Sequence, residues 1–571
     1  MSGVWDAAGP GVRPADRMHA RLASRARDVP SFRAPPEPML IGRPVRGRHL
    51  LEGNLRFAGT LVQIPAGAPP WEFDLPDEVM AELHRFAWLD DLAALGGRRA
   101  WAAARSWTLD WTRRFGRGAG AGWTAARTGR RLLAWIDHAG MIEAGPEAKG
   151  FDAGFRRSLG GQARFLVRRW RAAPPGPARI DALTGLLRAG LALSGAAFPL
   201  AAAADALARE GEAATGPEGA LPSRNPERLA ELHARLAWAA GALEEGGHSP
   251  PGALGEALKR SAAILRALRH ADGGLVTMHG GSHGVEGRLD AALARGGAAG
   301  PSGRMAMGFA RLSEGRVTVI ADAAPPPAGH ASRDAHASTL AVEITAGREP
   351  LLVSCGSGAP FGPDWRRVGR ATGSHSVLSL GGGSSARLAP PVRRGGEMLE
   401  LLEWGPREVT RAVGTRRGGE EGDPGALVLD MSHDGWRESH GLIYRRQVAL
   451  HRDGCEVAGE EVLVAETDRD LRLFGMAASE GSEDGEMEFA VRFHIHPEAE
   501  VSADPEQGSA TVALPSGALW VLRHDGVGQL GVEPSVYFDP ALLHPLTGQQ
   551  IVLSGRVEEA ATRLRWSLAR G

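Results

Sequence analysis

The spacing of apolar residues changes near residue 272, and this change constrains the fold more than any other feature of the sequence. Before it, apolar residues recur three and four positions apart, which is the spacing of amphipathic helices. After it, apolar and polar residues alternate in short runs bounded by Gly, Asp and Pro, as in half-buried β-strands. The sequence therefore predicts a helical region followed by a β region.

The helical region is predicted to be a set of stacked helical hairpins. Residues 77–95 carry one apolar stripe, with Asp77 and Glu78 favouring a helix start and Gly96 a helix end. Segments of the same pattern follow, separated by clusters of Gly and Pro, and short connections between helices indicate antiparallel pairs. These segments are expected at residues 99–115, 121–140, 152–172, 179–194, 197–210, 225–245 and 252–271.

The second region is predicted to be a large antiparallel β-sandwich. It has roughly thirteen or more short strands, with hairpin signals such as Asp453-Gly454 between them. Because a chain of 571 residues exceeds what one hydrophobic core can hold, we divide it into parts. We expect a flexible arm rich in Pro and Arg over residues 1–44, a helical domain over 45–272 and a β domain over 273–571.

Charge and N-terminal composition exclude several classes of partner. The 67 acidic and 66 basic residues nearly cancel, so no net field attracts nucleic acid. No apolar run is long enough to span a membrane. Residues 1–38 contain no apolar core followed by a small-residue cleavage site, so we expect a cytoplasmic protein without a membrane span or a nucleic-acid partner.

Two clusters near the change of pattern are candidates for chemistry. In LPSRNPERL, Arg224 and Asn225 stand at a helix start, where a positive helix end can hold a carboxylate. A simple capped helix start explains the same residues. The segment RHADGGLVTMHGGSHG places three histidines in one loop, where His270 or His279 can act as a general base near neutral pH. A hairpin with solvated histidines is the alternative.

Two later clusters place histidines beside strands. His336 in SRDAHASTLAVE and His375 in TGSHSVLSL, together with Asp334, form a candidate site for a divalent metal ion. His494 and His496 in FHIHP point to one face of a strand, which a polar sheet face explains. Ten of the fifteen tryptophans lie in the first 240 residues; we assign most of them to the core, with a sugar-binding cleft as the alternative.

Several segments, in order along the chain, resemble the heparinase II/III family of polysaccharide lyases. HRFAWLDDLAALGG and SRNPERLAELHARL resemble its helical toroid. The marks of its C-terminal β domain are AHASTLAVEITAGREPLLVSCGS, RATGSHSVLSLGGGSSARL, FHIHPEAEV, LPSGALWVL and VEPSVYFD. The resemblance extends from residue 45 to the end and implies an α/α toroid joined to an antiparallel β-sandwich.

The resemblance also implies β-elimination in polysaccharides that contain uronic acid. This reaction removes the proton on C5 of the uronate, after donors such as Asn, His or Arg neutralise the neighbouring carboxylate and make that proton more acidic. A base, usually Tyr or His in the family, takes the proton, and an acid protonates the leaving glycosidic oxygen. All of these groups must converge on one sugar between the two domains.

The sequence departs from the family pattern in two places. Active members typically supply a tyrosine from the toroid, whereas here no tyrosine precedes Tyr444 and Arg228 takes the aligned position. Where members often carry an HxHxD pattern near a metal ion, this chain has Asp334, His336 and Ser338. Tyr444 falls within a strand, and we assign it no catalytic role.

We therefore predict a lyase that acts on an acidic polysaccharide. The alternative is a catalytically degenerate protein of the same fold, which binds carbohydrate or serves the polysaccharides of the cell envelope. No cofactor is required, although a structural zinc ion suits the two histidines; the family resemblance makes the cell envelope or periplasm the alternative to the cytoplasm. The predicted residues are, as catalytic groups, His279, His270, Asn225, Arg224 and His336; as substrate-binding groups, Arg228, Trp238 and Arg370; and, as metal ligands, His336 and His375.

Overall fold

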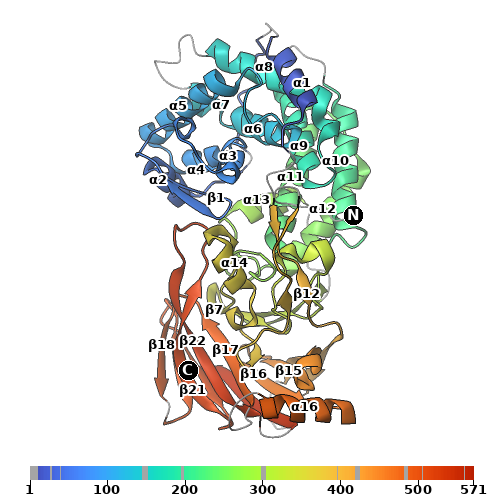
Figure 1. The fold of residues 1–571 in the computed structure, drawn as a ribbon, viewed down its shortest axis with the longest axis vertical. Coiled ribbons are helices and arrows are strands. Elements are labelled where there is room, and N and C mark those ends of the chain that lie inside the picture. The colour runs from blue at the N-terminus through green and yellow to red at the C-terminus, as the bar shows by residue number, and fades with distance from the viewer. Residues whose placement is uncertain are drawn as a thin grey trace.

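The computed structural model consists of a helical body and a β body (Figure 1). It describes residues 11–25, 29–38, 40–143, 152–194, 198–296, 304–394, 397–417, 425–480, 487–504, 506–557 and 560–571. The helical body is a curved stack of helices, and the β body lies below it in the view of Figure 1. The predicted fold class, an α/α toroid followed by an antiparallel β-sandwich, is confirmed.

The toroid consists mainly of helices at the positions that the apolar spacing predicted. The helices predicted from residue 99 onward are present as α5, α6 and α8 to α12, with ends shifted by a few residues. No helix among the described residues is both long and apolar enough to cross a membrane. The elements are α2 (Pro44–Leu51), β1 (Asn54–Phe57), β2 (Thr60–Gln63), α3 (Asp77–Leu83), α4 (Trp88–Leu95), α5 (Gly97–Phe115), α6 (Ala125–Asp137), α7 (Ala139–Glu143), α8 (Asp152–Arg169), α9 (Pro177–Ala192), α10 (Leu200–Thr215), α11 (Pro226–Glu245) and α12 (Gly252–Ala267).

One predicted helix is divided in two. Residues 77–95 form α3 and α4, separated by a turn in which Phe86 has a positive φ of 60°. The Phe86 ring is fully buried, with its centroid 4.8 Å from that of Trp88 and 5.2 Å from that of Trp135. In the same turn, His84 Nδ1 accepts a hydrogen bond from Trp111 Nε1 over 2.7 Å. These tertiary contacts hold the strained turn in place, and apolar spacing carries no sign of them.

Helices α6 and α9 approach so closely that glycine is required where they touch. A Cβ on Gly129 would lie 2.2 Å from the carbonyl oxygen of Asp181, and a Cβ on Gly185 would lie 2.2 Å from the carbonyl oxygen of Gly129. The surrounding core is aromatic, and the prediction that most tryptophans pack in the core is confirmed, because eight of them are buried in the toroid, whereas Trp101 is 43% exposed. The fully buried tryptophans of the toroid are Trp88, Trp107, Trp111, Trp123 and Trp135.

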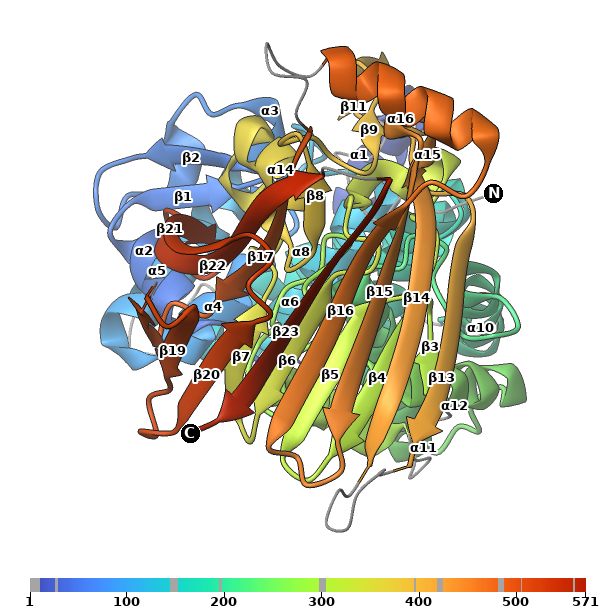
Figure 2. The ribbon, with the colours of Figure 1, turned by 90° about the horizontal axis from the view of Figure 1, so that it is seen from below.

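The β body contains two large antiparallel sheets (Figure 2). One has the order β13-β14-β15-β16-β23-β20-β19-β18, and the other the order β21-β22-β17-β7-β6-β5-β4-β3, with β8 also paired to β17. The first sheet comprises β13 (Val409–Arg416), β14 (Ala426–Trp436), β15 (Leu442–His451), β16 (Glu456–Val464), β18 (Glu500–Asp504), β19 (Ser509–Ala513), β20 (Leu519–His524) and β23 (Ala561–Arg570). The second comprises β3 (Met305–Ala306), β4 (Phe309–Glu314), β5 (Val317–Asp322), β6 (Val342–Ala346), β7 (Glu349–Val353), β8 (Leu378–Leu380), β17 (Met487–Ile495), β21 (Gln529–Tyr537) and β22 (Leu546–Val557).

The region beyond residue 272 also contains helices, which the strand pattern did not reveal. They are α13 (Arg288–Arg295), α14 (Pro363–Arg370), α15 (Arg437–His440) and α16 (Asp468–Glu480). Helix α13 packs against α11, so helical packing continues past the change of pattern. Proline at the first position of α14 and aspartate in the first turn of α16 are start signals that a search for caps would have found.

The segment that we expected to be a flexible arm contains a docked helix. Helix α1 (Pro14–Ser24) packs against α8, and its buried Asp16 pairs with Arg169 over 2.8 Å. Gly161 of α8 lies so close to α1 that a Cβ on it would be 3.4 Å from the carbonyl oxygen of Ala23. The buried ion pair and the close packing on α8 therefore hold α1 in place, contrary to the expected flexibility. Residues 1–10 lie outside the described residues.

Candidate functional site

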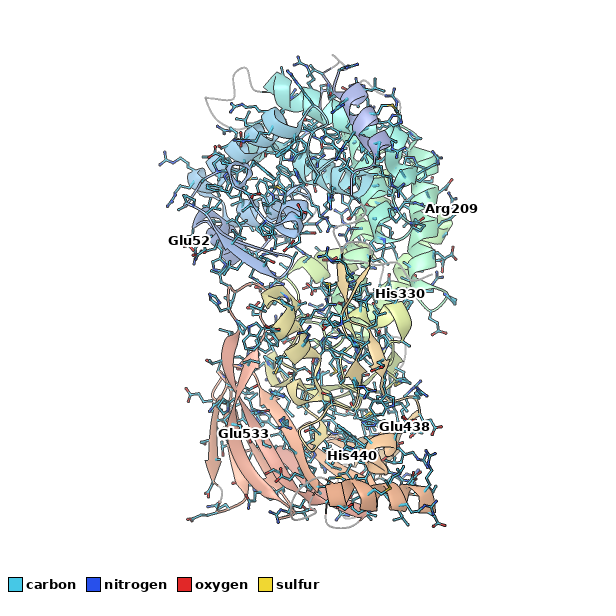
Figure 3. All side chains as sticks on the ribbon, viewed as in Figure 1. Glu52, Arg209, His330, Glu438, His440 and Glu533 are labelled. Atoms are coloured by element: carbon cyan, nitrogen blue, oxygen red, sulfur yellow. The ribbon has the colours of Figure 1, made fainter. Side chains whose placement is uncertain are left out.

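Four segments meet at the seam between the toroid and the β body. They are the start of α11, the loop 269–284, the residues that follow the 3-10 turn η4 (Gly329–Asp334), and the stretch from α14 to His375. Side chains from both bodies crowd this level of the molecule, at the height of His330 in Figure 3. The four segments carry all of the predicted site residues except Trp238.

Arg224 connects the two bodies and is saturated with acceptors. Arg224 is 8% exposed. Its Nε donates to the carbonyl oxygen of Met307 over 3.0 Å, and its Nη atoms donate to the carbonyl oxygens of residues 308, 324 and 325. Nη2 also pairs with the carboxylate of Asp322 on β5. These contacts use every N–H group of the guanidinium, so none is left for a substrate carboxylate.

His279, one of the two predicted bases, is fully enclosed. It has no exposed surface and a positive φ of 52°. Its Nε2 lies 3.0 Å from Oδ2 of Asp322, and its Nδ1 accepts the backbone N–H of His336 over 3.1 Å. Burial lowers the pKa of His279, although Asp322 opposes this effect. Nδ1 is therefore already occupied as an acceptor, and Nε2 is enclosed beside Asp322 with no exposed surface.

Asp322 is the centre of this cluster, and the sequence prediction missed it. It is fully buried and accepts a hydrogen bond from Ser338 Oγ over 2.7 Å. Burial alone would raise the pKa of Asp322, but Arg224 and His279 outweigh burial and hold it well below its usual range. Asp322 ends the apolar strand VTVIAD, and a carboxylate closing a buried strand is a signal that a cation lies beside it.

His336 and His375 extend the cluster into the β body. Their ring centroids are 5.1 Å apart, and His336 Nε2 accepts the backbone N–H of Gly280 over 3.0 Å. Burial lowers the pKa of both histidines, that of His375 to about 3. Across the described ranges, no three His, Cys, Asp or Glu side chains are placed to hold a metal ion. Metal binding by His336 and His375 therefore stays a prediction, with no third ligand beside them among the described residues.

The other predicted polar residues of the seam are also engaged within the protein. Asn225 caps α11, because its Oδ1 accepts the backbone N–H of Arg228 over 3.1 Å. The Arg228 guanidinium lies 2.7 Å from Oδ2 of Asp334. Arg370 is 4% exposed and donates to the carbonyl oxygens of residues 332, 335 and 400. Each of these groups therefore has a structural partner.

His270 and Trp238 have partners of their own. His270 is 7% exposed, and its Nε2 lies 3.2 Å from Oε2 of Glu343, which also accepts from the backbone and hydroxyl of Thr277. Trp238 is buried in α11, where the guanidinium of Arg188 lies 5.6 Å from its ring. Neither side chain contributes to the cluster around Asp322.

An accessible histidine lies at the same seam, and our prediction passed over it. His283 closes the loop 269–284, and its side chain is 50% exposed. Its Nε2 lies 3.1 Å from Oδ2 of Asp272, and this hydrogen bond raises the pKa of His283. At the ends of β17 and β21, the centroid of the His496 ring lies 5.1 Å from that of Tyr537. Burial lowers the pKa of His496, and the charges of His283 and Asp272 also act on it.

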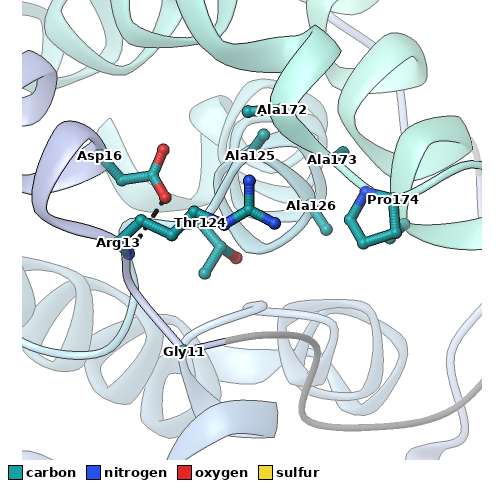
Figure 4. A pocket seen from close by; sticks show the side chains of 10 residues that line it. Gly11, Arg13, Asp16, Thr124, Ala125, Ala126, Ala172, Ala173 and Pro174 are labelled. Atoms are coloured by element: carbon teal, nitrogen blue, oxygen red, sulfur yellow. Dashed lines mark hydrogen bonds between the residues drawn. The ribbon is translucent and has the colours of Figure 1, made fainter. Parts of the chain in front are cut away.

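A small pocket lies far from this seam, beside α1 (Figure 4). It encloses about 30 Å³ and is lined by residues that include Arg13, Asp16, Thr124 and Pro174. Such a volume suits a water molecule and not a sugar ring.

Comparison with known proteins identifies the family. Residues 298–567 match the model of the heparinase II/III-like C-terminal domain. A crystal structure of heparinase III has a TM-score of 0.63 with this chain at 13% identity, and the match covers 98% of this chain and 93% of that one. The chain belongs to the heparinase II/III family. A mutant of the heparan sulfate lyase HepC from Pedobacter heparinus is also similar, with a TM-score of 0.55 at 14% identity over 97% of this chain and 87% of that one.

One curated protein of similar sequence has a name of a different kind. FtsZ-localized protein C of Caulobacter vibrioides is 32% identical over 538 residues, which make up 92% of this chain and 88% of the relative. The two solved structures are too distant in sequence to show more than the heparinase fold, and fold alone does not establish activity. The predicted family is thus confirmed, and the function of this heparinase II/III member has to be argued from its own side chains.

Proposed function

We propose that this chain is a catalytically inactive member of the heparinase II/III family that serves as a binding protein and localises with FtsZ. One observation carries the first part of the proposal. His279, one of the two predicted bases, is fully buried, and each of its ring nitrogens faces a protein group at about hydrogen-bond distance. A general base must reach the proton that it removes directly or through one water. A C5 proton could reach His279 only if the seam opened.

The groups that would neutralise a uronate carboxylate support the same view. Arg224 is saturated by carbonyl oxygens and by Asp322, and Arg228 pairs with Asp334. In a lyase, such donors must be aimed at the charge that develops on the substrate. Here both arginines pair with carboxylates of the protein itself, those of Asp322 and Asp334. The cluster therefore joins the two bodies instead of binding a substrate.

The two tyrosines of the chain offer no replacement for the missing base. Tyr444 is fully buried, donates to Glu461 Oε2 over 2.5 Å, and has a pKa that burial raises well above its usual value. Burial also raises the pKa of Tyr537. A phenol with a raised pKa carries little phenolate near neutral pH and is a poor proton acceptor.

The second part of the proposal rests on the curated relative. FtsZ-localized protein C is named for its location, and it matches this chain over 92% of its length at 32% identity. A protein that acts by binding at that location needs a rigid surface and no open catalytic groove. The sealed seam of this two-body fold agrees with such a role.

Two experiments test these parts separately. Incubation with heparin, heparan sulfate, alginate and hyaluronan should give no ultraviolet absorbance of an unsaturated uronate, while heparinase III produces it from heparan sulfate in the same assay. Formation of that product by this protein would contradict the first part. A fluorescent fusion should co-localise with FtsZ in cells, and an even distribution would contradict the second part.

A lyase that uses other side chains is the second candidate, and one observation favours it. His283 is half exposed at the seam with a raised pKa, and its charge acts on His496, whose ring packs beside Tyr537. Three carboxylates also act on this group, those of Asp272, Asp539 and Glu498, and they would repel a uronate. If unsaturated product forms, His283→Ala should abolish it, whereas His248→Ala, at an exposed position of the toroid, should not.

A further inference from the structure

We propose that the outward faces of α1 and α8 form a docking surface for an acidic polypeptide segment that carries apolar side chains. The surface is distinct from the seam, and the proposal does not depend on whether the chain cleaves a polysaccharide. We call it the α1/α8 face. Its members are Arg17, Met18, Arg21, Leu22 and Arg25 on or next to α1, and Arg157 and Arg168 on α8.

Positive charge is concentrated on these two helices. Residues 13–25 and 152–171 together hold ten arginines against two aspartates, a formal charge of +8, in a chain whose formal net charge is −1. The two segments are neighbours, because Asp16 near the start of α1 pairs with Arg169 at the end of α8, and Gly161 of α8 approaches the end of α1. The helices therefore run antiparallel, and their outward faces adjoin.

Most of this charge is not neutralised by the fold. On α1, exposed arginines follow one another at intervals of four residues. The ion pairs that these helices form within the described ranges include Arg169–Asp16 and Arg156–Glu143. They leave five exposed arginines without an acidic partner among the described residues, namely Arg17, Arg21, Arg25, Arg157 and Arg168.

Two apolar side chains stand among these arginines. Met18 and Leu22 are 53% and 47% exposed and lie one turn apart on α1. The opposite side of α1 is buried against the toroid, so the helix cannot turn Met18 and Leu22 inward. Partner surfaces commonly combine a small apolar centre with a complementary charged rim. An acidic segment with apolar anchors matches both the charge and the apolar pair.

Two other polyanions match the α1/α8 face less well. Nucleic-acid interfaces are more polar than protein interfaces and are contacted mainly by basic side chains, so a nucleic acid would account for the arginines but not for the exposed Met18 and Leu22. An anionic bilayer is bound by helices that sink a broad apolar face into the interface. Helix α1 offers two exposed apolar side chains, and packing on α8 prevents it from sinking further.

The test uses the full chain and a fluorescein-labelled synthetic peptide of Glu and Asp with two leucines one helical turn apart. We expect saturable binding by fluorescence anisotropy that weakens as salt is added. R17E/R21E should raise Kd by at least about tenfold. M18S/L22S should raise it too, although it leaves every charge in place. R348E/R523E, which makes the same charge change at exposed positions of the β body, should leave Kd unchanged.

Three outcomes would overturn the proposal. The first is an equal loss of binding in R17E/R21E and R348E/R523E, which would indicate attraction by charge alone. The second is no loss in M18S/L22S, or no loss when the peptide leucines are changed to serine. The third is tighter binding, lost in R17E/R21E, of phosphatidylglycerol vesicles or of a single-stranded oligonucleotide. Thermal unfolding of each variant, all changed at exposed residues, confirms that the fold is intact.

Discussion

Replacement of Arg224 by alanine is expected to loosen the seam between the two bodies. The change removes the guanidinium that pairs with Asp322 and leaves this fully buried carboxylate with His279 and Ser338 alone. Breaking a buried ion pair from one side costs ~3–5 kcal/mol. Water that enters the vacated space can donate hydrogen bonds to the carbonyl oxygens of residues 307–308 and 324–325, so these groups do not add to the loss of stability. The predicted loss of unfolding free energy is therefore ~3–5 kcal/mol.

Urea unfolding with two probes measures this loss. Tryptophan fluorescence reports mainly on the toroid, which holds most of the tryptophans, and far-ultraviolet circular dichroism reports on both bodies. The two curves should coincide in the wild type and separate in R224A, because the toroid and the β body are no longer fastened. R228A, in the first turn of α11 just after Arg224, is the matched control. It breaks the pair with Asp334 but leaves that carboxylate in contact with Arg366 at 3.3 Å, so it should cost less than R224A. Coincident curves for R224A, with a loss no greater than that of R228A, would refute the reasoning.

Three further changes test other parts of the account. Stability should fall as the pH drops below 6.5, because His375, His433 and His494 are buried with pKa values lowered by burial to about 3, 4 and 4 and bind protons only when unfolded. Between its two pKa values, each such histidine lowers the free energy of unfolding by about 1.4 kcal/mol for each pH unit of acidification. His375→Asn should remove the contribution of one proton from this pH dependence. An unchanged slope would count against a buried neutral ring at His375. Gly129→Ala should cost ~1–3 kcal/mol by overpacking the contact of α6 with α9, whereas Gly140→Ala, where a Cβ meets nothing within 4 Å, should not destabilise. Asp16→Ala should speed hydrogen exchange in α1 without changing exchange in α9, and unaltered exchange in α1 would show that the ion pair with Arg169 does not hold the helix.

The fold could be predicted from the sequence because it follows from periodicity. Most helices of the toroid and the strands of both sheets repeat their apolar residues with the period of the element. The prediction was wrong where a tertiary contact outweighs local preference. The turn at Phe86 depends on rings contributed by other helices, and α1 depends on Arg169 from far along the chain. Neither contact leaves a trace in local spacing.

The site could be predicted in composition but not in accessibility. The sequence identified His279, His336 and His375 as residues that come together, and the structure brings them together. It could not show that Asp322 closes the cluster or that Arg224 is saturated, because both depend on which atoms of the β body face the start of α11. The exposed member of the loop, His283, lies four residues after the buried His279, and the contacts that separate them come from other segments.

The most direct test of the sealed seam is exchange of the imidazole C2 hydrogens, measured for each histidine by mass spectrometry in deuterated water. The account predicts that His279, His336 and His375, which are at most 1% exposed, exchange far more slowly than His283, whose side chain is 50% exposed. Exchange of His279 at the rate of His283 would contradict the account, because it would mean that the seam opens to solvent and that the predicted base is within reach of a substrate.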